Sequence, residues 1–241
     1  MNIDHSFESL VTAIVPTLNE GASIYRLLEK LSELYPDLNV LVVDDNSSDD
    51  TQDKVREFAK KIGKEKQYQL LERIDVKVRG ITASVLDGLA RIESEYFFVM
   101  DGDLQHPPEA VAKMLAELEA GNDIVVGERS PYVERQGLHR VLITWTATQL
   151  AKFYLKLRDF RLLDPMAGFF GAKFSSIEVA LEESNRSRFE PEGYKVLFDL
   201  LRIVPKDLKL SSFSYDFTLR SGGESKLRPV HAWFFLRSMF K

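Results

Sequence analysis

The sequence predicts an α/β fold in which helices flank a mostly parallel β-sheet. Its apolar runs lack the polar alternation of half-exposed strands, so we expect strands that are buried on both faces. Segments of helical period separate these runs, and this alternation favours a parallel sheet. The 241 residues, 44% of them hydrophobic, suffice for one large domain. We expect that domain to span residues 1–227, with a short amphipathic helix over 228–241.

The strands and helices of the first half are expected in strict alternation. Proline at 107 and 108 suits the first turn of a helix, and Gly63 suits the end of one. The expected strands cover 11–16, 39–43, 69–71, 96–100 and 123–127, and the expected helices cover 23–34, 51–62, 80–92 and 107–118.

The pattern changes after Gly127. A polar loop leads into a long helix over 138–157, and "DPMAGFFGAKF" predicts a turn and a short strand. A further helix is expected over 193–203 and a strand over 208–217. No repeat or low-complexity linker divides the chain, so a single domain with a carboxyl-terminal elaboration is the simplest interpretation.

Composition excludes several classes of protein. The chain has no cysteine, which excludes disulfides and zinc-cysteine sites. Its apolar runs fall far short of the ~20 residues that span a bilayer, and its polar amino terminus does not resemble a secretory signal. The net charge is -5, yet residues 202–241 carry eight Lys or Arg against three Asp or Glu. Such a basic segment suits anionic lipid, phosphate groups or nucleic acid, or is merely a solvated surface.

Polar clusters follow three of the expected strands. They are "PTLNE", "DDNSSDD" and "DGDLQHPPE". One such cluster alone is more typical of helix capping and turns. In an open parallel sheet, however, ligands bind beyond the carboxyl ends of the strands, where all three clusters are expected to lie. Their convergence predicts a ligand site.

The "DGDLQ" segment predicts a metal and diphosphate site. Asp101 and Asp103 stand two residues apart at a strand end, and Gly102 lets a ligand approach the backbone. Their carboxylates and the Gln105 carbonyl oxygen suit Mg²⁺ or Mn²⁺ shared with phosphate oxygens. A response-regulator receiver is disfavoured, because its acidic pair follows the first strand, whereas Asp44 and Asp45 follow the second.

The sequence resembles the GT-A glycosyltransferases of family 2, and among them the dolichyl-phosphate (polyprenyl-phosphate) mannose synthases. The resemblance covers nearly the whole chain. It implies a Rossmann-like, mixed and mostly parallel sheet, with a nucleotide-sugar-binding half over 1–127 and an acceptor-side half over 128–227. The motifs that carry it are "IVPTLNE", "VLVVDDNSSDDT", "VMDGDLQHPPE", "IVVGERS", "DPMAGFF", "EGYKVLFDLL" and "LRSGGESKL".

The resemblance also implies roles for individual residues. Asp103, Arg129 and Arg220 are the expected catalytic residues, and Asp101, Asp103 and Gln105 are the expected metal ligands. The residues expected to bind donor, diphosphate or acceptor phosphate are Pro16, Glu20, Val43, Asp45, Asp101, Gly102, Asp103, Gln105, Arg129, Arg140, Arg220, Ser225 and Lys226. Leu18 departs from the family, which usually has an aromatic residue there to stack on the base.

The implied reaction moves mannose from GDP-mannose to a dolichyl or polyprenyl phosphate with inversion, and it depends on Mg²⁺ or Mn²⁺. A UDP-sugar donor, another acceptor and a non-catalytic nucleotide-binding subunit remain alternatives. A processive synthase is disfavoured, because Gln136 and Arg140 are one residue too far apart for its motif. Asp164 either positions the acceptor, acts as a base or closes a turn, and the turn is favoured.

The last residues suggest how the chain meets a membrane. Trp233, Phe234, Leu236 and Phe240 give residues 228–241 the composition of an interfacial helix, although a terminal helix packed on the core fits equally well. We expect a peripheral enzyme on the cytoplasmic face of a membrane, with a membrane-protein partner as a further option and no nucleic-acid partner.

Overall fold

The computed structural model describes residues 5–130, 138–216 and 237, and all seven expected strands are present in it. The first part contains α1 (His5–Glu8), β1 (Val11–Thr17), α2 (Ile24–Leu34), β2 (Asn39–Asp44), α3 (Thr51–Ile62), β3 (Tyr68–Glu72), α4 (Ile81–Leu89), β4 (Tyr96–Val99), a 3₁₀ turn η1 (Pro108–Ala110), α5 (Val111–Glu119) and β5 (Ile124–Arg129). The second part contains α6 (Leu138–Lys156), β6 (Phe170–Lys173), α7 (Phe174–Leu181), α8 (Glu183–Arg186), α9 (Val196–Ile203) and β7 (Leu210–Tyr215).

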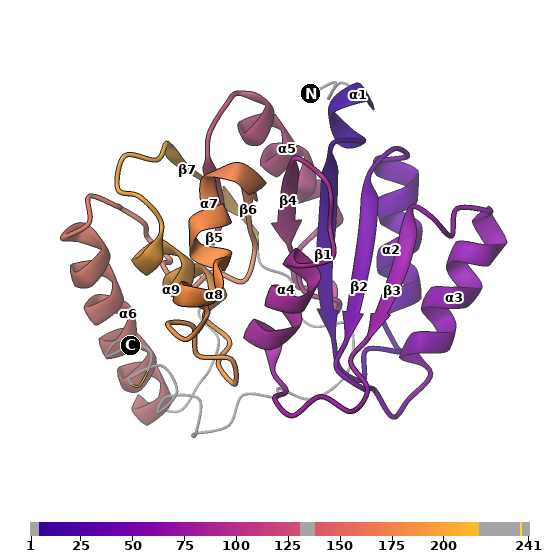
Figure 1. Ribbon diagram of the computed structural model, residues 1–241, viewed down its shortest axis with the longest axis horizontal. Helices are drawn as coiled ribbons and strands as arrows, with labels where there is room; N and C mark the ends of the chain where they lie inside the picture. The colour runs from indigo at the N-terminus through magenta and orange to yellow at the C-terminus, as the bar shows by residue number, and fades with distance from the viewer. Residues whose placement is uncertain (1–4, 131–137, 217–236, 238–241) are drawn as a thin grey trace.

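The strands form one sheet in the order β3-β2-β1-β4-β6-β5-β7. β1, β2, β3 and β4 run parallel, and β7 pairs parallel with β5. β6 is the exception, since it is antiparallel to both β4 and β5. The arrows of β1 and β2 therefore end together at the lower side of Figure 1, where the polar clusters collect.

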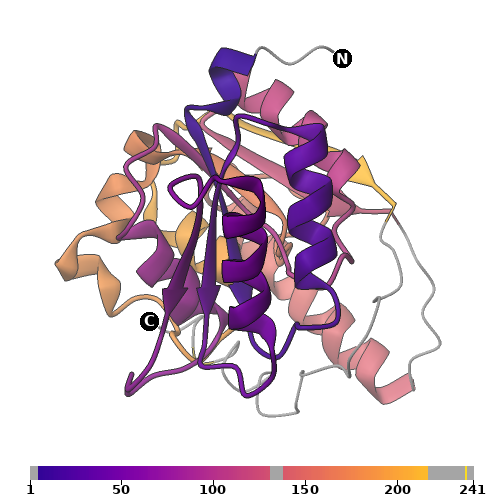
Figure 2. The same ribbon diagram turned by 90° about the vertical axis from the view of Figure 1, so that its right-hand side faces the viewer.

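Helices cover both faces of the sheet, and each face has its own hydrophobic core (Figures 1 and 2). Successive residues of a strand point to opposite faces. In β1, Ile14 packs into one core, whereas Ala13 and Val15 pack into the other. Residues of α4, α6, α7 and α9 complete the first core, and residues of α1, α2, α3 and α5 complete the second. This double coverage explains the continuous apolar runs of the sequence.

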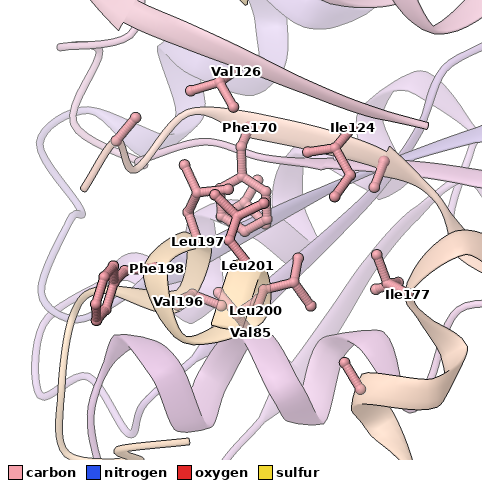
Figure 3. Packing of buried hydrophobic residues seen from close by; sticks show 14 of the residues in the cluster. Val85, Ile124, Val126, Phe170, Ile177, Val196, Leu197, Phe198, Leu200 and Leu201 are labelled. Carbon is pink, nitrogen blue, oxygen red and sulfur yellow. The ribbon is translucent and has the colours of Figure 1, made fainter. Parts of the chain in front are cut away.

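The helix α9 is the centre of the first core. Leu197 and Leu201 face Phe170 of the sheet, and Val196 and Leu200 lie on the side of α9 nearer to Val85 (Figure 3). Every residue of α9 from Val196 to Arg202 is buried. The residue that precedes α9 therefore has a fixed position, which matters for the site described below.

Three short helices, α1, α7 and α8, and the place of β6 were not predicted. α7 and α8 follow β6, and neither has a side-chain hydrogen bond at its N-cap. The expected interfacial helix over 228–241 lies outside the described residues, apart from Arg237. Within the described part of the chain, no helix has the length and apolar composition needed to cross a membrane.

Gly171 allows β6 to lie between β4 and β5. A Cβ atom at this position would lie 2.8 Å from the Phe97 carbonyl oxygen and 3.0 Å from the Phe98 Cβ. Backbone atoms of a central strand have no room to move, because the strand is paired on both sides.

We predict that Gly171→Ala destabilises the fold by about 1–3 kcal/mol, the usual range for overpacking a core. The midpoint of urea unfolding measures the change. Gly168→Ala is the matched control, since its Cβ would meet its nearest neighbour at 3.4 Å, an ordinary contact. Equal unfolding midpoints for the two variants would contradict this account of the β6 insertion.

Candidate active site

The "DGDLQ" segment forms a tight turn directly after β4. Asp103 is almost completely buried, and its Oδ1 accepts a hydrogen bond of 3.0 Å from the Gln105 backbone N–H. Leu104 adopts φ = +64°, a left-handed conformation that costs about 1–3 kcal/mol for a residue with a side chain. This strained residue lies between two of the expected metal ligands, so the turn is held against an intrinsic preference of the chain.

His106 stabilises the turn by accepting a hydrogen bond from its backbone. The Asp101 backbone N–H donates to His106 Nδ1 at 3.0 Å, and Nε2 lies 3.7 Å from Asp101 Oδ2. The ring is buried and stacks on Phe169 at 5.3 Å between centroids. Burial lowers the pKa of His106, although the Asp101 and Asp103 carboxylates oppose this shift. The imidazole is therefore neutral at pH 7, with its one proton on Nε2, on the side of the Asp101 carboxylate.

The segment before β6 brings a second set of charges to the same place. Arg129, at the end of β5, donates to Asp164 Oδ2 from Nε at 3.0 Å and from Nη2 at 2.9 Å. Burial lowers the pKa of Arg129, but Asp164, together with Tyr215 and Asp101, opposes this shift and leaves the pKa raised. Asp164 Oδ1 accepts from the Met166 N–H, so Asp164 both closes a turn, as favoured, and binds Arg129.

Lys195 points into this segment from the other side. It is the residue before α9, and its Nζ lies 3.5 Å from the Met166 carbonyl oxygen. Burial lowers the pKa of Lys195 to about 7, while the charges of Asp164 and Asp101 partly restore it and that of Arg129 lowers it further. The end of β4, the end of β5 and the start of α9 therefore meet in one electrostatically coupled site.

Asp45 occupies a separate, almost completely buried position beyond β2. Its Oδ1 forms an ion pair of 2.5 Å with Arg73, and its Oδ2 accepts from the Gly80 backbone N–H at 2.8 Å. Arg73 also donates from Nε to Asp87 Oδ2 at 2.8 Å. Both oxygens of Asp45 are thus fixed by the loop that precedes α4.

The polar turn after Asp45 connects two loops as well as the start of α3. Ser47 donates to Asp44, and Asp50 pairs with Lys54. Asp49 holds the start of α3, since its Oδ1 accepts from the Thr51 N–H at 3.0 Å, and its Oδ2 accepts from the Gly21 N–H. This turn therefore ties the loop after β1 to the loop after β2.

The remaining expected site residues have different positions. Pro16 is buried in β1, and Glu20 is partly exposed beyond its end. Val43 is fully buried, and its side chain packs in the first core. Arg140 lies in the first turn of α6, but its side chain is outside the described part. Three expected phosphate-binding residues also lie outside it: Arg220, Ser225 and Lys226.

The turn after β4 fits a divalent cation by its donor chemistry. It offers carboxylate and amide oxygens, and the side chain of Asp101 is 36% exposed. The opposite wall is Gly168, where even a Cβ would lie 3.8 Å from both Asp101 carboxylate oxygens. Another group of possible ligands in the described residues, His5, Glu8 and Asp37, lies near the amino ends of β1 and β2, away from this site.

Sequence reasoning missed Arg73, Asp87, His106 and Lys195. His106 and Lys195 stand inside motifs quoted above, yet neither residue type at that place indicates a role without the fold. Arg73 follows β3 directly, so its place at the carboxyl edge was an available signal.

Comparison with known proteins identifies the family. The model of the family described as "Glycosyl transferase family 2" matches residues 12–181. A dolichol-phosphate mannosyltransferase of Pyrococcus furiosus is 31% identical over 237 residues, which is 96% of this chain but 63% of that protein. The chain thus spans less than two thirds of that relative. A dolichol-phosphate mannosyltransferase of Saccharomyces cerevisiae is 29% identical, over 94% of this chain and 82% of the relative.

Solved structures agree on the fold. The Mycobacterium tuberculosis glucosyl-3-phosphoglycerate synthase in complex with Mn²⁺, uridine diphosphate and phosphoglyceric acid matches with a TM-score of 0.68. It is 19% identical and is matched over 100% of this chain and 82% of its own. The same enzyme with Mg²⁺ and uridine diphosphate gives a TM-score of 0.69. The expected GT-A fold is confirmed, and the chain belongs to glycosyltransferase family 2.

Proposed function

We propose that this chain transfers mannose from GDP-mannose to a dolichyl or polyprenyl phosphate. The relatives named dolichol-phosphate mannosyltransferase support mannose as the sugar and a dolichyl phosphate as the acceptor. The observation that carries the proposal is the meeting of the Asp101 turn with Arg129 and Asp164 at one edge of the sheet. This arrangement places oxygen ligands for a cation beside a fixed guanidinium, as transfer from a nucleoside diphosphate requires.

The acceptor chemistry explains why the site needs no strong base. A phosphate monoester has a second pKa of about 6, so it is mostly dianionic at neutral pH and attacks directly. One phosphate oxygen forms a bond to the anomeric carbon while the bond from that carbon to the diphosphate breaks. A single in-line displacement inverts the anomeric centre, which turns an α-linked donor into a β-linked product. Arg129 is placed to bind phosphate oxygen on the acceptor side.

A divalent cation, Mg²⁺ or Mn²⁺, belongs to this proposal. Solved neighbours of the same fold hold either ion together with uridine diphosphate. Asp101, Asp103 and Gln105 would bind the ion here, and it would neutralise charge on the departing diphosphate. His106 keeps the Asp101 backbone in place, and the Leu104 conformation sets the turn between the ligands.

We further propose that α6 rests on an anionic membrane surface. Leu150 and Phe153 of α6 and Leu157, directly after it, are 41%, 65% and 63% exposed, and their spacing puts them on one side of this helical segment. Leu163, which directly precedes Asp164, is 71% exposed and adds an apolar side chain next to the site. Exposed Lys156 adds positive charge suited to anionic lipid. Peripheral association with the cytoplasmic face would bring a lipid-linked phosphate to Arg129.

The experiment that tests the proposed function measures transfer of radiolabelled sugar into the organic phase. GDP-mannose and UDP-glucose are supplied separately, with polyprenyl phosphate and Mn²⁺ or Mg²⁺. Label extracted with GDP-mannose is expected. Label from UDP-glucose alone would transfer the assignment to a UDP-sugar enzyme. Nucleotide binding without any transfer would instead support the non-catalytic alternative.

We predict that Asp103→Asn lowers the transfer rate by about 10²–10³-fold, the usual loss when one charge-stabilising group is removed. The variant keeps the size of the buried side chain, so its unfolding midpoint should stay close to that of the wild type. Asp53→Asn, whose side chain is 85% exposed on α3, is the control and should transfer normally. Transfer by Asp103→Asn at the wild-type rate would refute the metal assignment.

We predict that Arg73→Leu weakens binding of the nucleoside diphosphate and destabilises the fold by about 3–5 kcal/mol, because it leaves Asp45 buried without its cation. Titration calorimetry and urea unfolding measure the two effects. Arg56→Leu is the matched control, since Arg56 forms ion pairs on the surface and should change stability by about 0–1 kcal/mol. Equal losses in the two variants would show that the buried network has no special role.

We predict that Phe153→Ser combined with Leu157→Ser reduces sedimentation with anionic vesicles by tenfold or more. Burial of each side chain is worth roughly 1.5–3 kcal/mol. Transfer to a short-chain acceptor in detergent should change much less. Val179→Ser on α7, which replaces another exposed apolar side chain, is the control. Unchanged sedimentation of the double variant would refute the α6 surface.

A further inference from the structure

The ammonium group of Lys195 has weaker stabilising contacts than the guanidinium of Arg129 in the same site. In the part of the chain that the structure describes, no carboxylate oxygen forms an ion pair with its Nζ. Its neighbours are the Met166 carbonyl oxygen, at a long 3.5 Å, and the ring of Tyr194, whose centroid lies 4.1 Å away. Arg129 in the same site is already bound by Asp164. The ammonium group of Lys195 is therefore the less satisfied of these two cations.

The backbone holds Lys195 in place from both sides. On one side, the Gly193 and Pro191 carbonyl oxygens accept from the N–H groups of Thr82 and Ala83, both at 3.2 Å. On the other side, α9 is embedded in the first core (Figure 3). A flexible side chain on such a rigid base is suited to bind a group at a fixed distance, since little backbone order is lost on binding.

We propose that Lys195 binds a phosphate oxygen in the reaction site, as a residue beyond the arginines and the metal ligands. The inference rests on the proposed function, because only a reaction with phosphate groups brings such an anion here. Two sources share this chemistry, the acceptor phosphate and the diphosphate of the donor. The position beside Met166 and Asp164, close in the chain to the exposed side chain of Leu163, favours the acceptor.

The titration of Lys195 supports this role. Burial lowers the pKa of Lys195 to about 7, so this amine exchanges its proton near neutral pH rather than near its ordinary pKa. The charges that face it are Asp164, from the segment before β6, Asp101, from the end of β4, and Arg129, from β5. Above pH 7 the enzyme must take up a proton to bind an anion through Lys195, so affinity should fall as the pH rises.

Titration calorimetry with farnesyl phosphate, and separately with GDP or UDP in the presence of Mn²⁺, tests the inference. The variants are Lys195→Met, which removes the charge but keeps the length, and Lys195→Arg, which keeps a charge that does not titrate. We expect Lys195→Met to weaken farnesyl phosphate binding roughly 10- to 100-fold, the effect of losing a charged hydrogen bond. Lys195→Arg should bind more tightly than Lys195→Met.

The pH dependence separates binding from a structural role. Between pH 7 and 9 the phosphate stays dianionic. The wild type should then lose affinity by up to about tenfold per pH unit, whereas both variants should show no such slope. A loss confined to farnesyl phosphate assigns Lys195 to the acceptor, and a loss confined to GDP or UDP assigns it to the diphosphate.

The failures are distinguishable. Equal affinities of wild type and Lys195→Met for all three ligands, or equal pH slopes, would overturn the inference while leaving the proposed function intact. Wild type that bound none of the three ligands would overturn both. Urea unfolding of Lys195→Met should match the wild type, because the ammonium forms no ion pair with the described residues, and a large loss of stability would indicate a structural role instead.

Discussion

The reversed direction of β6 is the constraint on which the site depends. Because β6 runs antiparallel to β4 and β5, its amino end lies at the edge where their carboxyl ends lie. The residues that precede β6, rather than those that follow it, are therefore delivered to the Asp101 turn. Gly168 in that segment lies against Asp101, and Gly171 permits the insertion. A parallel strand at this position would have carried Asp164 to the opposite edge.

The two neighbouring residues Glu128 and Arg129 fix the segment that precedes β6. Their side chains point to opposite sides of β5, yet both contact the segment before β6. Glu128 Oε1 accepts from the Leu163 N–H at 2.6 Å, and Arg129 binds the Asp164 carboxylate. The guanidinium is thus oriented before any ligand arrives. Asp45 and Arg73 are likewise held by an ion pair beyond the ends of β2 and β3. A ligand that binds such a site orders few further side chains, because ion pairs already hold them.

Local patterns in the sequence predicted the strands and long helices, because burial on both faces leaves unbroken apolar runs such as Tyr96 to Met100. The pairing of β6 could not be read locally, since its partners lie more than forty residues away along the chain for both β4 and β5. The "DGDLQ" turn was predicted because its residue types carry its chemistry. Arg73 and Lys195 were not, because basic residues are common and only the fold shows that Arg73 is buried and that Lys195 lies beside Met166.

Under the proposed function, the exposed apolar side chains of α6 and Leu163 have a physical role in binding a lipid-linked acceptor. Leu163 is exposed, and the next residue, Asp164, forms an ion pair with Arg129. A lipid-linked acceptor would place its charged head near Arg129 and the apolar carbons next to the head near Leu163. A soluble acceptor would gain nothing from Phe153 or Leu157, whose exposure to water is unfavourable. The distribution of polarity therefore favours an amphipathic substrate over a wholly polar one.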